Sequence, residues 1–166
     1  MRKLRFAGVF GASAVLVFAA VAVASVSPIP RNPYNPGPCE PAPNGVGLQG
    51  NSANDTINGT PNKDLLRGGG GNDSIFGKGA RDCVNGQGGR DLVSGQRGAD
   101  NVKGGRGADR LRGGRGPDAL RGGPRNDRLN GNAGANLLNC GRGKRDVAIV
   151  HPKDTVRRNC EIQIPA

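Results

Sequence analysis

The chain has 166 residues, of which thirty are glycine and twelve are proline, and only 3% are aromatic, with no tryptophan. This composition excludes a conventional globular core, which needs many large apolar side chains. Because ordering glycine costs more backbone entropy than ordering any other residue, a folded state requires free energy from metal ions, disulfides or a partner.

The N-terminal segment 1–24 is predicted to be a secretory signal peptide. Arg2, Lys3 and Arg5 precede an uncharged apolar stretch that runs from Phe6 to Ala24, and Ala22-Val23-Ala24 fits a small-x-small cleavage site. The alternative is an uncleaved membrane anchor, since the stretch is close to the length that spans a bilayer. Cleavage is the better interpretation, because the stretch is rich in Gly, Ala and Ser.

The segment 25–47 carries seven prolines between Pro28 and Pro43. Proline removes a backbone donor and fixes φ, so this segment cannot form a regular helix or a central strand. We expect an extended linker or leader.

A nine-residue repeat occupies residues 48–139. An aspartate recurs every nine residues without a break, an aliphatic residue follows it two positions later, and a glycine follows four positions later. The aspartates are Asp55, Asp64, Asp73, Asp82, Asp91, Asp100, Asp109, Asp118 and Asp127. Asn136 and Leu138 continue the pattern in a weakened form.

Each repeat predicts one short strand and one tight turn. The aliphatic residue and its two neighbours form a minimal strand with one inward side chain, and the glycine-rich stretch before each Asp supplies the positive φ of a turn. Stacked repeats would bring Asp carboxylates and backbone carbonyls together at the turns. Such oxygen ligands, without His or Cys, favour calcium.

The segments GGGGND (68–73), GGRGAD (104–109) and GGRGPD (113–118), each followed by x-aliphatic-x, resemble the RTX, or hemolysin-type, calcium-binding nonapeptide repeats. The resemblance implies an all-β fold, a right-handed parallel β-roll with two nonapeptides per turn. It also implies calcium between each turn and the turn two repeats later, and folding when calcium binds.

On this resemblance the nine aspartates are the expected metal ligands, with up to seven sites from the pair Asp55/Asp73 to the pair Asp109/Asp127. The pairs with intact glycines are Asp73/Asp91, Asp91/Asp109 and Asp100/Asp118. The expected backbone carbonyl ligands are those of Gly68, Gly86, Gly95, Gly104, Gly105, Gly107, Gly113, Gly114 and Gly116. The alternative for any single Asp is a turn-capping role without metal.

Four repeats depart from the pattern at the position two residues before the Asp, where glycine is expected. That position holds Ala53, Asn62, Ala80 or Arg125, and Ala and Arg adopt a left-handed conformation poorly. Asn136 replaces an Asp and removes a charge.

The repeats carry more Lys and Arg than Asp, which is unusual for repeats that bind calcium. Cations are expected at the turn tips and on outward strand positions, at Arg97, Arg106, Arg115, Lys103, Arg110, Arg112, Arg121 and Arg128. Bound calcium would raise the positive charge further, so weak sites are expected. The cations indicate either solubility or a surface for acidic cell-envelope polymers.

Specific nucleic-acid binding is the rival interpretation of the RGG and GRG strings. Disordered RNA-binding segments of this kind carry interspersed aromatics, whereas Phe76 is the only aromatic in 51–139. The strict period of nine also has no place in that interpretation.

Four cysteines in an exported chain predict two disulfides. Cys140 and Cys160 bracket the last segment, 140–166, which we expect to be a disulfide-linked cap on the open end of the solenoid. A bridge between Cys39 and Cys83 is the weaker expectation, and intermolecular bridges or free thiols are the alternative.

No catalytic machinery is predicted. His151 is the only histidine, the periodic aspartates are explained as ligands, and no Ser or Cys has a nearby base in a recognisable motif. The sequence thus predicts an extracellular calcium-binding repeat protein without a membrane span after cleavage, with a structural or adhesive role. The alternative is a basic scaffold for polyanions in which calcium is purely structural.

Overall fold

The computed structural model describes residues 27–28, 44–157 and 159–166. The predicted signal peptide and most of the predicted linker lie outside these residues. No helix in the described part of the chain is long and apolar enough to cross a membrane.

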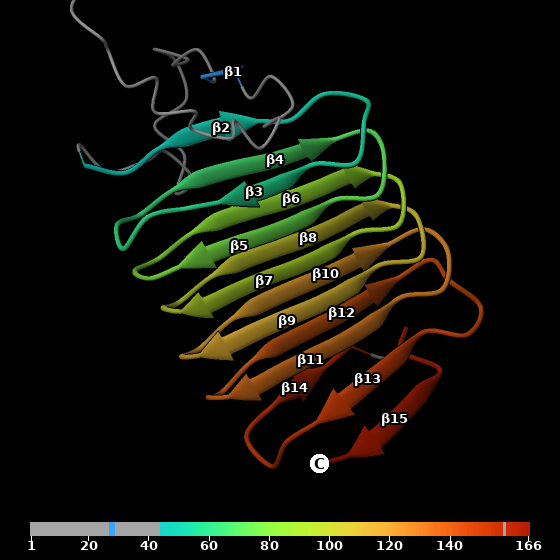
Figure 1. The fold of residues 1–166 in the computed structure, drawn as a ribbon. Helices are drawn as coiled ribbons and strands as arrows, with labels where there is room; N and C mark the ends of the chain where they lie inside the picture. The colour runs from blue at the N-terminus through green and yellow to red at the C-terminus, as the bar shows by residue number, and fades with distance from the viewer. Residues whose placement is uncertain (1–26, 29–43, 158) are drawn as a thin grey trace, which may run out of the picture.

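The described residues form a two-layered β-solenoid in which the chain alternates between two sheets (Figure 1). The first sheet, sheet A, contains β1 (Ser27–Pro28), β2 (Gly47–Gln49), β4 (Leu65–Gly69), β6 (Cys83–Gly88), β8 (Asn101–Arg106), β10 (Ala119–Gly123), β12 (Leu137–Gly141) and β14 (Thr155–Val156). The second, sheet B, contains β3 (Thr56–Asn58), β5 (Ser74–Lys78), β7 (Leu92–Arg97), β9 (Arg110–Arg115), β11 (Arg128–Ala133), β13 (Val147–Val150) and β15 (Ile162–Pro165).

Neighbouring strands are parallel, and two nonapeptides complete one turn. Val84 pairs with Val102 and Val93 pairs with Leu111, a step of eighteen residues in both sheets. The exception is the antiparallel pairing of β1 with β2. The all-β parallel roll expected from the resemblance is therefore confirmed.

One aliphatic side chain per strand builds the core. The two facing ladders are fully buried, with Leu66, Val84, Val102, Leu120 and Leu138 from sheet A and Ile57, Ile75, Val93, Leu111 and Leu129 from sheet B. The period of nine places each aliphatic above its equivalent in the preceding turn, so a single residue per repeat is enough for a continuous ladder. The core is consequently only one side chain wide in each sheet.

Most strands are longer than the three residues that the sequence predicts. From β4 to β12 they span five or six residues, because the glycine four positions after each Asp also lies in or at the end of the strand and is buried. Asp, aliphatic residue and glycine therefore all face inward. A Cβ at Gly86 would lie closer than 3.0 Å to both the Asp91 carboxylate and the Gly104 carbonyl oxygen, so glycine is required there.

From the turn before Asp73 to the turn before Asn136, two residues per turn have positive φ, whereas the sequence analysis expects glycine at only one of these positions. Two positions before the Asp, Ala80 and Arg125 adopt φ values of 64° and 78°, like the glycines of other repeats. Four positions before the Asp, Lys78, Gln87 and Gln96 also have positive φ. Non-glycine residues pay about 1 kcal/mol or more for this conformation, so the turns hold them against local strain.

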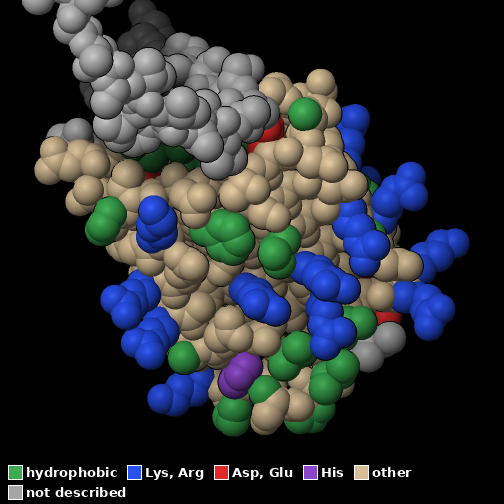
Figure 2. All heavy atoms as spheres, viewed as in Figure 1, with side chains coloured by type: hydrophobic (Ala, Val, Ile, Leu, Met, Phe, Trp, Pro, Cys, Tyr) green, Lys and Arg blue, Asp and Glu red, His purple; other side chains and the backbone are tan. Residues whose placement is uncertain are grey.

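Charge is segregated between the interior and the surface. Asp55, Asp64, Asp73, Asp82, Asp91, Asp100, Asp109, Asp118, Asp127 and Asp146 are buried. The cations at turn tips and outward strand positions are exposed, as expected. Figure 2 shows Lys and Arg side chains spread over one face of the molecule. Glu161 is the one exposed acidic residue in the described part of the chain.

Candidate metal sites: two columns of buried aspartates

The aspartates stack in two columns at opposite edges of the roll, where the chain passes from one sheet to the other. One column contains Asp55, Asp73, Asp91, Asp109, Asp127 and Asp146, and the other contains Asp64, Asp82, Asp100, Asp118, Asn136 and Asp154. The pairing of each Asp with the one two repeats later follows from the eighteen-residue turn.

One oxygen of each stacked carboxylate has a structural partner. The backbone N–H of Asp73 donates to Asp91 Oδ1 at 2.9 Å, and that of Asp100 donates to Asp118 Oδ1 at 2.9 Å. The same bond recurs along both columns. It is the turn-capping role that the sequence left open as the alternative for a single Asp.

The second carboxylate oxygen has no hydrogen-bond partner in most of these residues. Among the described residues, Oδ2 is buried and unpartnered in Asp73, Asp82, Asp91, Asp100, Asp109, Asp118, Asp127 and Asp146, with at most 3% of each residue exposed. A buried carboxylate oxygen without a donor is costly. Eight such oxygens in register indicate positions that a ligand completes.

Backbone carbonyls face the same spaces. A Cβ built at Gly77 would lie closer than 3.0 Å to Asp82 Oδ2 and to the Gly95 carbonyl oxygen, and Gly113 is crowded in the same way by Asp118 Oδ2 and the Gly131 oxygen. Of the carbonyls predicted as ligands, those of Gly68, Gly86, Gly95 and Gly104 crowd the equivalent glycine one turn earlier. The carbonyls of Gly105 and Gly116 instead face Gly123 and Gly134, one turn later.

The donor set fits calcium. Within the described residues no three His, Cys, Asp or Glu side chains gather at one point, so a cation here would draw on backbone carbonyls as well as carboxylates. All these donors are oxygens, which suit a hard cation with flexible coordination.

Burial raises the pKa of the eight aspartates whose Oδ2 is unpartnered. It raises the pKa of Asp82, Asp91 and Asp127 to about 7 and that of Asp118 to about 6, in spite of the backbone N–H bonds that favour the charged form. Neighbouring carboxylates in the column raise these pKa values further. A bound cation would offset both the desolvation and the mutual repulsion.

The first two loops of the repeat array are built differently. Asp55 Oδ2 accepts the N–H of Asn51 at 2.9 Å, and Asp64 Oδ2 accepts the N–H of Thr60 at 2.6 Å. Neither Asn51 nor Thr60 has positive φ, whereas the equivalent residue is turned to positive φ in every later repeat up to Asn132. The conformation four residues before the Asp thus decides whether a backbone N–H of the same loop reaches Oδ2, although Asp55 Oδ1 stays without a partner among the described residues.

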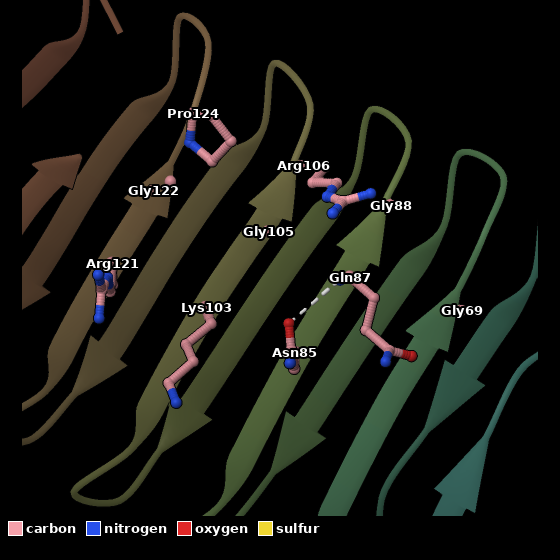
Figure 3. Close-up of a pocket in the computed structure, with 11 residues that line it drawn as sticks. Gly69, Asn85, Gln87, Gly88, Lys103, Gly105, Arg106, Arg121, Gly122 and Pro124 are labelled. Carbon is pink, nitrogen blue, oxygen red and sulfur yellow. Dashed lines mark hydrogen bonds between the residues drawn. The ribbon is translucent and has the colours of Figure 1, made fainter. Parts of the chain in front are cut away.

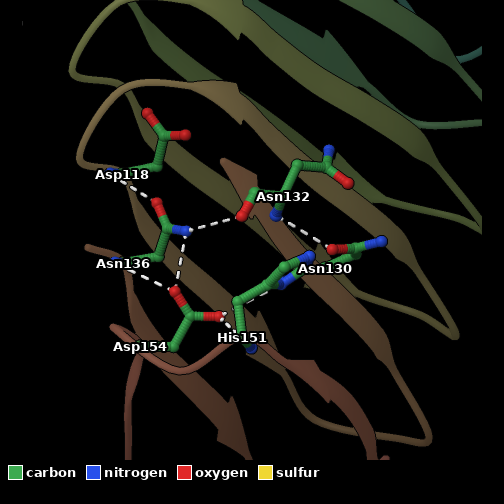
Figure 4. A network of polar contacts seen from close by, with 6 residues as sticks. All are labelled: Asp118, Asn130, Asn132, Asn136, His151 and Asp154. Atoms are coloured by element: carbon green, nitrogen blue, oxygen red, sulfur yellow. Dashed lines mark hydrogen bonds and ion pairs between the residues drawn. The ribbon is translucent and has the colours of Figure 1, made fainter. Parts of the chain in front are cut away.

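The second column ends in a network of side chains (Figure 4). Asn136 Oδ1 accepts the N–H of Asp118 at 2.9 Å, and its Nδ2 donates to Asp154 Oδ1 at 2.9 Å. The other oxygen of Asp154 accepts the N–H of His151 at 2.9 Å, and His151 Nδ1 lies 3.5 Å from it. The amide of Asn136 therefore fills the position that an unpartnered oxygen holds elsewhere.

Asp146 and Asp154 are site residues that the sequence analysis did not identify. Asp127 donates its N–H to Asp146 Oδ1 at 2.7 Å, and Asp146 in turn donates its own to Glu161 Oε2 at 2.9 Å. Asp146 follows Asp127 by nineteen residues instead of eighteen, so a search for aspartates at a spacing of nine does not find it. Asp154 follows Asn136 by eighteen and could have been found by extending the period.

Cysteines hold the C-terminal end of the roll together. Cys140 on β12 and Cys160 are joined by a disulfide and both are buried, as the sequence favours. Cys83 is also disulfide-bonded, and Cys39 lies outside the described residues. Strands β13, β14 and β15 continue the two sheets beyond the repeats.

Comparison with known proteins gives the family. The profile of the RTX calcium-binding nonapeptide repeat (4 copies) matches residues 49–82, 85–120 and 112–144, more than half of the chain. No curated protein and no solved structure gives a significant match to this chain. RTX nonapeptide repeats bind calcium ions. With its two columns of inward aspartates and its matched repeats, this chain belongs to the RTX calcium-binding nonapeptide repeat family.

Proposed function

We propose that this protein is an exported structural module whose solenoid orders when calcium binds to the aspartate columns. The observation that carries the proposal is the set of eight buried Asp side chains with an unpartnered Oδ2. Without a cation, these carboxylates oppose the folded state. With calcium, the same oxygens become ligands and hold consecutive turns together.

The thin core supports a requirement for calcium. Each nonapeptide buries one aliphatic side chain but orders nine backbone units, several of them glycine. Apolar burial on this scale is small beside the conformational entropy of the repeat. Cation binding supplies the missing free energy in this proposal.

The proposed location is outside the cell. Segment 1–24 acts as a cleaved signal, segment 25–47 as a linker, and segment 140–166 as a disulfide-linked cap that closes the solenoid. The disulfide between Cys140 and Cys160 supports an oxidising compartment. In that setting the ordered roll has a structural or adhesive role at the cell envelope or beyond it, with no catalytic function.

A second candidate role is binding of polyanions, in particular acidic envelope polymers. The distribution of charge favours it, because the described surface carries many exposed cations and only one exposed acidic residue, Glu161. In this role calcium is structural.

A circular dichroism titration tests the main proposal. The oxidised full chain should gain β-sheet signal on addition of calcium and lose it in excess chelator, with a midpoint of about 0.1–1 mM, as in extracellular calcium modules. Magnesium at the same concentration is the control, and it should be much less effective. The same β-sheet signal in calcium and in chelator would rule the proposal out.

A further inference from the structure

The outer face of sheet A carries a shallow furrow that crosses its strands. The hollow has a volume of about 680 Å³ and extends from Gly69 on β4, over β6 and β8, to Pro124 just after β10. Four parallel strands span three spacings of about 4.8 Å, so the furrow is about 14 Å long. Figure 3 shows the side chains that border it.

Glycines make the floor of this furrow. Gly69, Gly105 and Gly123 occupy the same position on β4, β8 and β10, four residues before an Asp, and all three have positive φ. Because these glycines have no side chains, the surface is hollow along this row of positions. Between β4 and β10 the one side chain at this position is that of Gln87 on β6. On sheet B the equivalent position carries the side chains of Lys78, Gln96 and Asn132, with Gly114 as the one glycine among them.

Cations and amides make its walls. Asn85, Lys103 and Arg121 are in direct register on β6, β8 and β10, and all three side chains face outward along one side of the furrow. Gln87 and Arg106 complete the lining. Lys103, Arg106 and Arg121 are exposed, and none of them has an ion pair within the described residues.

The lining side chains offer mainly hydrogen-bond donors. Lys and Arg have no acceptor. Asn85 Oδ1 already accepts the N–H of Gln87 at 3.1 Å, and Gln87 Oε1 accepts Gln49 Nε2 at 2.9 Å. Each of these amide oxygens keeps one lone pair, but the two amide NH₂ groups and the three cations, which have no side-chain partner among the described residues, outnumber the acceptors. This lining suits a ligand rich in anionic and neutral oxygen acceptors.

We propose that this furrow binds an extended acidic polysaccharide, with carboxylates on Lys103, Arg106 and Arg121 and hydroxyl oxygens on Asn85 and Gln87. A linear polymer matches a row of donors repeated at the strand spacing. A nucleic acid is less suited, since no aromatic side chain lines the furrow for base stacking. The proposal specifies the ligand of the second candidate role. It depends on calcium-dependent folding only in that the furrow requires the folded roll.

Two triple variants test the site at constant net charge. The furrow variant is Lys103→Ser/Arg106→Ser/Arg121→Ser. The matched control, Arg110→Ser/Arg112→Ser/Arg128→Ser, removes three exposed cations from the outer face of sheet B. Circular dichroism in calcium first establishes that each variant folds. If a triple variant does not fold, the single variants Lys103→Ser and Arg112→Ser replace it.

Binding of a fluorescent hyaluronan oligosaccharide is then measured by anisotropy in saturating calcium and 0.15 M salt. The furrow variant should bind about tenfold more weakly than the wild type, the loss expected for three exposed charge contacts. The control variant should lose less than about threefold, the share expected from screened long-range attraction. A neutral dextran oligosaccharide should not bind.

Three results would overturn the proposal. They are no binding of hyaluronan by the folded wild type, equal weakening in both variants, or tighter furrow-dependent binding of oligothymidylate than of hyaluronan. Since folding is measured separately, a failure of calcium-dependent folding is distinguishable from a failure of the furrow to bind.

Discussion

The backbone N–H of Asp91 donates a 2.9 Å hydrogen bond to Oδ1 of Asp109, the equivalent residue one turn later, while Oδ2 of Asp109 has no partner. One carboxylate thus joins two turns through one oxygen, and its other oxygen is the ligand in the calcium binding that we propose. An Asp→Asn substitution can keep the first function, because the amide retains an oxygen acceptor, and remove the second. This substitution therefore separates calcium binding from turn stacking.

Asp100→Asn should weaken calcium binding, whereas Asp64→Asn should not. Asp100 Oδ2 is unpartnered, but Asp64 Oδ2 accepts the N–H of Thr60 and its Oδ1 accepts the N–H of Val46. We expect Asp100→Asn to lower the number of calcium ions bound, measured by equilibrium dialysis. Asp64→Asn should destabilise the fold by about 1–3 kcal/mol at unchanged stoichiometry. Equal loss of calcium in both variants would contradict this division.

Acid should partly replace calcium. The pKa values of Asp82, Asp91 and Asp127 rise in the folded chain from 3.8 to about 7, mainly through burial. The stability from protonating these groups is fully present below pH 3.8 and is lost as pH rises through 7. The calcium-free chain should therefore show more β-sheet signal at pH 4 than at pH 7.5.

The same protons compete with calcium for these oxygens. The calcium midpoint for folding should rise as pH falls from 8 to 6, and circular dichroism titrations at several pH values measure it. A midpoint that does not change over this range would show that the raised pKa values do not belong to the metal-binding carboxylates.

Periodicity predicted much of the fold but could not predict how each turn closes. Asp, aliphatic residue and glycine recur at fixed positions, so the inward ladders could be read from the sequence. The pairing at eighteen residues was expected from the resemblance to the RTX repeats, not from the period of nine. The positive φ of Gln87 and Gln96 could not, because neighbouring turns impose it on residues that do not favour it. The bonds from Asn51 N–H to Asp55 Oδ2 and from Thr60 N–H to Asp64 Oδ2 depend on the direction of one N–H in each loop, and the fold sets that direction.

Adjacent glycines in one turn should differ in their tolerance of a methyl group. Gly71 has φ 91°, and a Cβ there would lie closer than 3.0 Å to the carbonyl oxygen of Ala53. The nearest atom to a Cβ at Gly70 is 3.5 Å away, which is an ordinary contact. Gly71→Ala should lower the free energy of unfolding in calcium by about 2 kcal/mol, and Gly70→Ala by less than about 0.5 kcal/mol. Denaturant unfolding measures both, and similar values would show that the turn relaxes freely.

The disulfide should stabilise the C-terminal end of the roll. It closes a loop with a sequence separation of twenty between two buried cysteines. Replacing both with alanine should cost about 3 kcal/mol, the entropy of a loop of this size. Hydrogen exchange should accelerate first in β12 and β14, which pair beside Cys140. Unchanged protection there would mean that strand pairing alone holds this end.

Asp146 should extend the calcium binding proposed for the first aspartate column by one position beyond the repeats. Its Oδ2 is buried and unpartnered, like those of the repeat aspartates, and its Oδ1 accepts the N–H of Asp127. Asp154 holds the corresponding place in the second column, but both of its oxygens already accept hydrogen bonds, from Asn136 and from His151. Asp146→Asn should therefore lower the number of bound calcium ions, and Asp154→Asn should leave it unchanged. Equilibrium dialysis against radioactive calcium distinguishes the two variants, with circular dichroism in saturating calcium as the check on folding. If both variants keep the wild-type number, the first column ends at Asp127, within the repeats themselves.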